Sequence, residues 1–293
     1  MSLFLTNVPD PPAAEDPVSL DPARPPRRIP NLAHALLFVS FAGLLLILIQ
    51  VVFLALGILP TTIHAGAITV QHPKLQIAMQ TATYLTTLLV AWIFYPLVWK
   101  RAFVDGLQWR WTTARLNASK LIALGFLLSA MMQVLTYLIT PPKKLPIDVF
   151  FLTPSNAWLI TVFGTLVAPV FEEICFRGFL LPAFAIAYDW LSLPRTENAL
   201  ARWQATTSLT PLGLIFSAIL TSILFAMMHF QQDAHMWAVM LVLFSVSLAL
   251  TFVRIKTQSV AASAVVHAAY NLFDFLLLFI ATGGYRHLDR MSR

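Results

Sequence analysis

Charged residues are scarce in this chain. Lys, Arg, Asp and Glu together make up 11% of its 293 residues, whereas a soluble domain is roughly one quarter charged. Hydrophobic residues make up 58% of the chain, and its mean hydropathy is +0.76. Water is therefore not the main solvent of this protein.

Cysteine is almost absent, since Cys175 is the single one. This excludes an internal disulfide and any zinc motif built from several cysteines. We interpret Cys175 as a small hydrophobic side chain without a nucleophilic role. The formal charge of +6 is also dispersed, because Lys and Arg stand singly between apolar runs and form no continuous basic face. No nucleic-acid partner is therefore expected.

The N-terminal segment lacks the features of a cleavable signal peptide. Residues 1–30 contain eight prolines and charges of both signs without apolar periodicity, a composition that predicts a disordered tail. A basic region followed by an apolar one is missing. Insertion into the membrane is therefore expected to depend on the first spanning helix.

Long apolar runs recur along most of the chain. Crossing about 30 Å of hydrocarbon takes roughly 20 helical residues, so these runs predict spanning helices and not barrel strands. The expected fold is an all-α, polytopic transmembrane bundle of about seven to eight helices with a polar intramembrane cavity. The fourth run is long, and Pro169 favours a kink or break after a separate short helix that starts at Asn156. The expected spans are 34–59, 77–98, 121–140, 156–190, 212–231, 237–253 and 259–282.

Basic residues between the spans predict the orientation. The connections 99–120, 192–211 and 254–258 all carry Lys or Arg, and such loops lie on the cytoplasmic side. This places the N-terminus inside. Seven spans would then place the basic C-terminal residues outside.

Ionisable side chains within the expected spans are few and clustered. Phe171-Glu172-Glu173-Ile174-Cys175-Phe176-Arg177 places two carboxylates and a guanidinium in an apolar helix, where each is costly. Glu173 and Arg177 are four residues apart and are expected to pair, whereas Glu172 points about 100° away. Glu172 is thus left without a local counter-charge. We predict it to be a general base that accepts a proton from water.

Two later motifs supply histidine. Phe225-Ala226-Met227-Met228-His229 closes an uncharged helix, and His267 and Asn271 share one face of the last span. Asp274 continues that face by one turn and could orient an imidazole. Antiparallel neighbouring helices bring the carboxylates and His229 to the same membrane side. All these groups are expected to converge at one depth.

The three motifs occur in order along the chain, as EExxxR at 172–177, FxxxH at 225–229 and HxxxN at 267–271. Together they resemble the CPBP, or Abi, family, which contains type II CAAX-prenyl endopeptidases and bacteriocin-processing or immunity-related membrane proteins. The resemblance covers roughly residues 156–282. It divides the chain into a Pro-rich tail, N-terminal spans with a basic loop, a CPBP-like catalytic core and a basic tail, at 1–30, 31–120, 121–285 and 286–293.

The resemblance implies a helical intramembrane endopeptidase. In it, Glu172 and His229 would activate a water molecule, and His267 and Asn271 would stabilise the oxyanion. Fixed donors aimed at a developing oxyanion agree with the chemistry of peptide hydrolysis. The supporting residues expected are Glu173, Arg177, Phe225 and Asp274.

The sequence allows two interpretations of the catalytic water, with and without a bound zinc ion. Glu172, His229 and His267 are also a plausible zinc set that leaves one position for water. The sequence lacks HExxH, in which two ligands share one helix turn. Activation of water without a metal, and therefore no cofactor, is the favoured interpretation.

The expected substrate is a membrane-associated or lipidated peptide or protein, cleaved in or near the plasma membrane of a prokaryote. A prenylated substrate requires a cell that prenylates proteins, which nothing in the sequence shows. One alternative is a membrane protein without enzymatic activity, such as an immunity factor or scaffold. Another is a small transporter, although the first three spans contain almost no ionisable residues.

Overall fold

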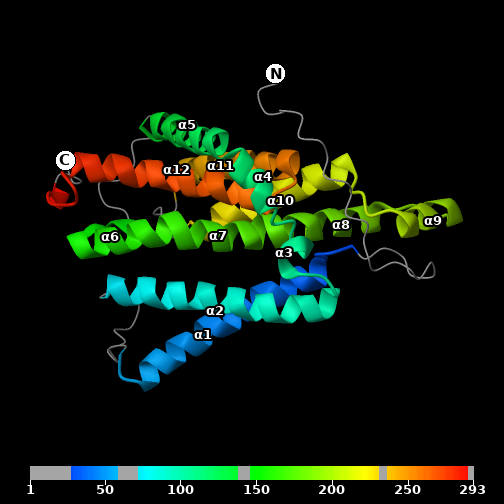
Figure 1. Cartoon of the computed structure of the whole chain (residues 1–293), viewed down its shortest axis with the longest axis horizontal. Coiled ribbons are helices and arrows are strands. Elements are labelled where there is room, and N and C mark those ends of the chain that lie inside the picture. The colour runs from blue at the N-terminus through cyan, green and yellow to red at the C-terminus, as the bar shows by residue number, and fades with distance from the viewer. Residues whose placement is uncertain (1–27, 59–71, 138–145, 231–235, 290–293) are drawn as a thin grey trace. The chain divides into compact units, whose positions relative to one another are not determined.

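The computed structural model describes residues 28–58, 72–137, 146–230 and 236–289. Within these ranges the regular structure is entirely helical, without a strand (Figure 1). Seven of the described helices are long and apolar enough to cross a membrane. The predicted polytopic helical fold is confirmed, and the chain is a multi-pass membrane protein. The spans are Leu32–Ala55, Pro73–Trp99, Ala118–Leu135, Pro154–Ser192, Pro211–Met228, Trp237–Thr257 and Val260–Ala281.

The fourth span is one continuous helix of 39 residues. The break considered at Pro169, which would have given eight helices, is not present there. The proline lies in the first turn of an α-helical segment, directly after a π-helical one, and a second π segment follows. The five segments are α6 Pro154–Val162, η2 Phe163–Val167, α7 Ala168–Glu173, η3 Ile174–Leu180 and α8 Leu181–Ser192, with η2 and η3 π-helical.

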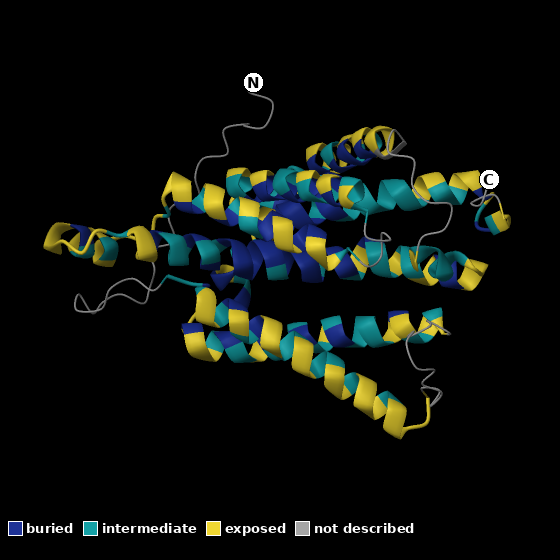
Figure 2. Cartoon of the chain, turned by 180° about the vertical axis from the view of Figure 1, so that it is seen from behind, coloured by how far each residue is buried: buried dark blue, intermediate teal, exposed yellow. Residues whose placement is uncertain are grey.

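Helices α1 (Leu32–Ala55) and α2 (Pro73–Trp99) pack side by side against the long helix. Their contact is aromatic: Phe38 of α1 stacks on Phe179 at 4.4 Å between ring centroids, and Tyr95 of α2 lies 4.9 Å from the same ring. Most of α1 is otherwise exposed (Figure 2). Since these exposed residues are apolar, they are suited to face lipid.

Helices α5 (Ala118–Tyr137) and α12 (Val260–Ala281) approach each other closely. Gly125 permits this approach, because a Cβ at that position would lie 2.6 Å from the carbonyl oxygen of Val266 and 2.7 Å from Cβ of Ala269. The contact lies next to His267. It therefore fixes the part of α12 that carries the predicted histidine.

Helices α10 (Pro211–Met228) and α11 (Trp237–Thr257) complete the bundle. The hydroxyl of Ser217 on α10 donates to the carbonyl oxygen of Leu181 at 2.6 Å, and Thr210, the N-cap of α10, donates from its backbone N–H to Asp189 of α8 at 2.9 Å. These bonds set the antiparallel register of α8 and α10. In consequence, the end of α10 lies beside η3, where Phe225 contacts Phe176.

Short helices occupy the basic connections. α3 (Phe103–Gly106) and α4 (Trp111–Leu116) lie within 99–120, where they meet the start of α12: the N–H of Val260 donates to Gln108 O at 3.1 Å, and Ser259 Oγ donates to Arg110 O at 3.0 Å. The orientation inferred from these loops stays a prediction.

Residues 192–208 form a separate compact unit together with Arg28. It contains α9 (Glu197–Ala205), and Arg28 lies 3.6 Å above the ring of Trp203 and donates to the carbonyl oxygens of Trp203 and Ser208 at 3.1 Å. Residues 1–27 of the predicted N-terminal tail and residues 290–293 of the predicted C-terminal tail lie outside the described residues. The boundaries predicted for the four segments stay predictions.

Candidate active site

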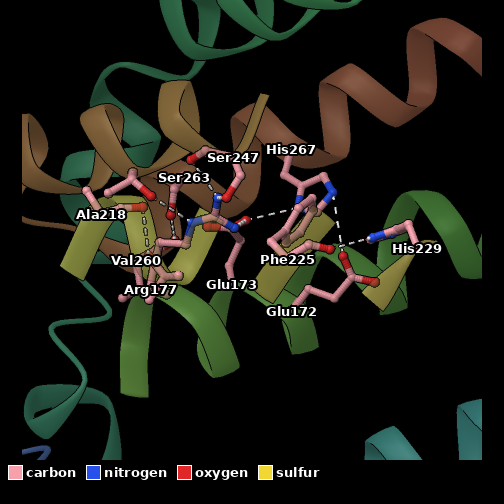
Figure 3. Close-up of polar contacts among 12 residues, drawn as sticks. Glu172, Glu173, Arg177, Ala218, Phe225, His229, Ser247, Val260, Ser263 and His267 are labelled. Carbon is pink, nitrogen blue, oxygen red and sulfur yellow. Dashed lines mark hydrogen bonds and ion pairs between the residues drawn. The ribbon is translucent and has the colours of Figure 1, made fainter. Parts of the chain in front are cut away.

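The polar residues singled out in the sequence come from three helices (Figure 3). α7 and η3 carry Glu172, Glu173 and Arg177, the end of α10 carries His229, and α12 carries His267. These side chains are almost completely enclosed: Glu173 and Arg177 are 0% exposed, His267 is 4% and Glu172 is 7%. Only His229 is half-buried. The site is therefore a cluster of ionisable groups inside the bundle.

Arg177 is held by α11 as well as by its own helix. Its NH1 group lies 2.7 Å from Oε1 of Glu173, the contact that the four-residue spacing predicts. Its NH2 group donates to the carbonyl and hydroxyl oxygens of Ser247, both at 2.8 Å, and its Nε donates to Thr251 Oγ1 at 3.4 Å. The face of the guanidinium lies 5.0 Å from the ring centroid of Phe225. This network satisfies a buried guanidinium that Glu173 alone would leave with free donors.

Glu173 also contacts His267, which the sequence reasoning missed. Oε1 of Glu173 lies 2.9 Å from Nδ1 of His267. An ionised carboxylate only accepts hydrogen bonds, so the Nδ1 atom is assigned as protonated. Glu173 therefore orients the imidazole and turns its Nε2 atom toward the other glutamate.

Glu172 is bound less tightly than its neighbour. Its Oε2 atom lies 3.8 Å from Nε2 of His267, which is longer than a hydrogen bond. Glu173, in contrast, has two partners within 2.9 Å. The carboxylate of Glu172 is thus enclosed, close to an imidazole, and free to accept a proton.

His229 lies at the C-cap of α10. Its Nδ1 atom is 3.0 Å from the carbonyl oxygen of Phe225; a carbonyl only accepts, so Nδ1 carries the proton and Nε2 is left as an acceptor. Figure 3 shows the Nδ1 atom joined by a dashed line to the carbonyl oxygen of Phe225. The ring of Phe225 packs against both histidines, at 5.0 Å from His229 and 5.7 Å from His267. Phe225 therefore separates and supports the two imidazoles.

Comparison with known proteins now adds a match to part of the chain. Residues 154–273 match the family described as type II CAAX prenyl endopeptidase Rce1-like. We call this matched region the Rce1-like domain. Neither a curated protein nor a solved structure matches the chain. The matched range contains all three motifs and supports protease activity within the membrane.

Several helices that contact the Rce1-like domain lie outside the matched residues. α1, α2 and α5 lie before residue 154, yet α1 contacts η3, α2 contacts α7, and α5 contacts α12. Any contribution of these helices to the site has to be inferred from the structure.

Asn271 has a structural role inside the Rce1-like domain. Its Nδ2 atom donates to the carbonyl oxygen of Gly164 at 2.7 Å. In the π segment the N–H of Ala168 bonds to the carbonyl of Phe163, five residues earlier. The next bond in that register would join residue 169 to Gly164, but Pro169 has no N–H. Asn271 thus replaces the missing donor, and one N–H of its amide stays available.

The hydrogen bonds of Asp274 among the described residues involve neither imidazole. Its carboxylate accepts hydrogen bonds from Ser129 and from Gln133, the latter at 3.0 Å, and both are on α5. An orienting role toward an imidazole has no support in these contacts. Asp274 instead joins α12 to α5, and Glu173 is the carboxylate that orients His267.

A zinc site would require Glu172, His229 and His267 to lie close enough together to share one ion. In the part of the chain that the structure describes, which includes Glu172, His229 and His267, no three His, Cys, Asp or Glu side chains form a group that could hold a metal ion. Nδ1 of both histidines faces an oxygen of the protein, which leaves Nε2 of each as the nitrogen that could bind a ligand. The mechanism proposed below depends on no metal.

Proposed function

We propose that this chain hydrolyses a peptide bond of a membrane-associated or lipidated peptide or protein. Glu172 and His229 would activate the water, and His267 and Asn271 would stabilise the oxyanion. The observation that carries the proposal is the enclosed carboxylate of Glu172, 3.8 Å from an imidazole whose other nitrogen is fixed by Glu173. The Rce1-like match supports the reaction class.

Charge balance supports the proposed role of His267 as a donor. Glu172, Glu173 and Arg177 together carry a charge of −1, and they are buried where an unbalanced charge is unfavourable. Protonation of His267 makes the cluster neutral and gives its Nε2 atom a hydrogen. An imidazolium with Nδ1 held by a carboxylate donates a charge-assisted bond from Nε2, which is the stronger kind. His267 is therefore suited to an oxyanion and not to proton abstraction.

The proposed reaction runs through a tetrahedral intermediate. Glu172 takes one proton from water, and the second hydrogen of the water forms a hydrogen bond to Nε2 of His229. The water oxygen then attacks the scissile carbonyl carbon. The carbonyl oxygen becomes an oxyanion that His267 and the free N–H of Asn271 stabilise. When the carbon–nitrogen bond breaks, the protonated Glu172 returns its proton to the leaving amine. Atoms and charges balance without a cofactor.

A comparison of peptide N-termini tests the proposal before any substrate has been identified. Membranes with wild-type protein or Glu172→Ala at matched abundance are compared for newly exposed N-termini, in the presence and absence of a strong zinc chelator. We expect termini that disappear in the variant and persist under chelation. Identical termini in both membranes would instead favour an immunity or scaffold protein, and loss under chelation would favour a metal-dependent mechanism.

Asn271→Ala is expected to lower kcat by about 100-fold, since removal of one oxyanion donor typically has an effect of about 10²–10³. It is also expected to lower the melting temperature, because the Gly164 carbonyl loses its donor. Turnover of an identified substrate and thermal unfolding are both measured.

A variant of Pro169 separates the two roles of Asn271. Pro169→Ala supplies a backbone N–H for the Gly164 carbonyl, so in that background Asn271→Ala should affect stability less and turnover as much as before. If turnover recovers together with stability, Asn271 holds the helix and does not stabilise the oxyanion.

A further inference from the structure

The segment that carries Glu172 is irregular. α7 contains six residues between two π segments and has a proline in its first turn. π turns interrupt the regular i→i−4 ladder and are often found at functional sites. Hydrogen bonds along the helix therefore position Glu172 less firmly than they position a residue inside a regular α-helix.

Side chains hold this segment from one face through the polar network. Glu173 contacts Arg177 and His267 within 2.9 Å, and these contacts tie the helix to α11 and α12. Among the described residues, the polar contact of Glu172 with His267 is longer, at 3.8 Å. The polar network thus fixes Glu173 and leaves the direction of Glu172 to be set by other contacts.

An aromatic stack holds the opposite face. Phe171 lies two residues before Glu173, which places it about 200° around the helix. The ring of Tyr84, on α2, stacks on Phe171 with 3.8 Å between centroids and 6° between planes. Phe38 of α1 lies 5.7 Å from Phe171. Phe171 is consequently enclosed by two helices outside the Rce1-like match.

Tyr84 contacts the first π segment as well. Its ring is also 5.7 Å from Phe163 in that segment. One aromatic ring of α2 therefore contacts the irregular helix on both sides of Pro169. Because the two rings of Tyr84 and Phe171 are in van der Waals contact over their faces, a change at Tyr84 alters the packing of Phe171.

We infer that Tyr84 is a positioning residue of the active site: its ring, stacked on Phe171, holds the α7 segment so that Glu172 faces the water and the scissile carbonyl. The inference rests on the proposed function and assigns part of the site to α2. The ring carries the role, and the hydroxyl is not required.

The test compares turnover of the reconstituted protein with that of three single variants and one double variant. Tyr84→Leu removes the stack and is expected to lower kcat by about tenfold or more with KM changed less than about threefold, since small misplacements of a reacting group have effects of this size. Tyr84→Phe keeps the stack and should retain kcat within about twofold. Phe171→Leu should reproduce Tyr84→Leu, and the double variant should lose no more than either single one.

Phe94→Leu is the matched control. Phe94 is also a half-buried aromatic residue of α2, in edge contact with Phe41 and Tyr95 at 5.4 Å, and it has no contact with α7 among those of the described residues. It should lower thermal stability about as much as Tyr84→Leu while leaving kcat unchanged.

Three results would overturn the inference. Wild-type kcat in a folded Tyr84→Leu variant removes the positioning role, and so does an equal loss of kcat in the Phe94→Leu control. A loss in Tyr84→Phe as large as in Tyr84→Leu would transfer the role to the hydroxyl. Should Tyr84→Leu fail to fold, Phe171→Leu decides by the same criteria. Full turnover in Glu172→Gln would refute the proposed function itself, a different outcome from failure of the Tyr84 variants alone.

Discussion

Arg177→Ala is expected to remove most of the folded protein from the membrane. The guanidinium is 0% exposed and lies 2.7 Å from the carboxylate of Glu173. Removing one partner of a buried ion pair destabilises by about 3–5 kcal/mol, because the other charge stays buried without compensation. Yield after detergent extraction and the midpoint of thermal unfolding measure the effect.

Two further variants identify its cause. Arg115→Ala removes an exposed arginine and should leave the yield unchanged. Glu173→Gln combined with Arg177→Met removes both charges and should recover part of the folded protein. A normal yield of Arg177→Ala would show that the pair contributes little to stability, and a double variant as unstable as the single one would point to lost packing instead of lost charge.

Glu172→Gln is expected to lower kcat by about 10³-fold or more, because an amide of the same shape cannot accept the proton of water and general bases contribute up to about 10⁴-fold. The substitution keeps the volume of the side chain, so the protein should fold normally. Kinetics with a substrate identified from the compared N-termini, together with thermal unfolding, measure both quantities.

Glu197→Gln is a suitable control for that experiment, since Glu197 is exposed on α9. It should retain wild-type kcat. A Glu172→Gln protein that is folded and still turns over at a comparable rate would exclude Glu172 as the general base.

Local spacing in the sequence predicted part of this site. The seven spans follow from apolar length, and the contact between Glu173 and Arg177 follows from their separation of four residues. Such features depend on one helix at a time, so composition and periodicity are enough to find them.

Contacts between helices were not predictable in the same way. Ser247 and Thr251 of α11 bind Arg177, and His267 of α12 binds Glu173. Which face of α11 meets η3 depends on packing angles between helices, and no single segment encodes these angles. The spacing of Ser247 and Thr251, four residues apart on one face of an apolar span, was the available signal. The assignment of Glu173 to Arg177 alone was incomplete for the same reason.

The continuity of the helix at Pro169 depended on a distant residue. A missing N–H normally breaks a helix, and here the amide of Asn271 supplies the donor from α12. Asn271 was singled out as an oxyanion donor, so its contact with Gly164 could be anticipated only once the π register was known.

The two π segments also affect how this helix can be aligned with others. A π turn contains one residue more than the α turn it replaces, and removing one residue between Phe163 and Val167 would rotate the preceding α6 by about 100° and shift it by about 1.5 Å relative to Glu172. Residues before Gly164 therefore face the same side of the helix only in homologous helices that also contain the extra residue of this π turn. An ungapped alignment across both segments would pair inward-facing residues with lipid-facing ones, whereas positions counted separately within α6, α7 and α8 would remain comparable.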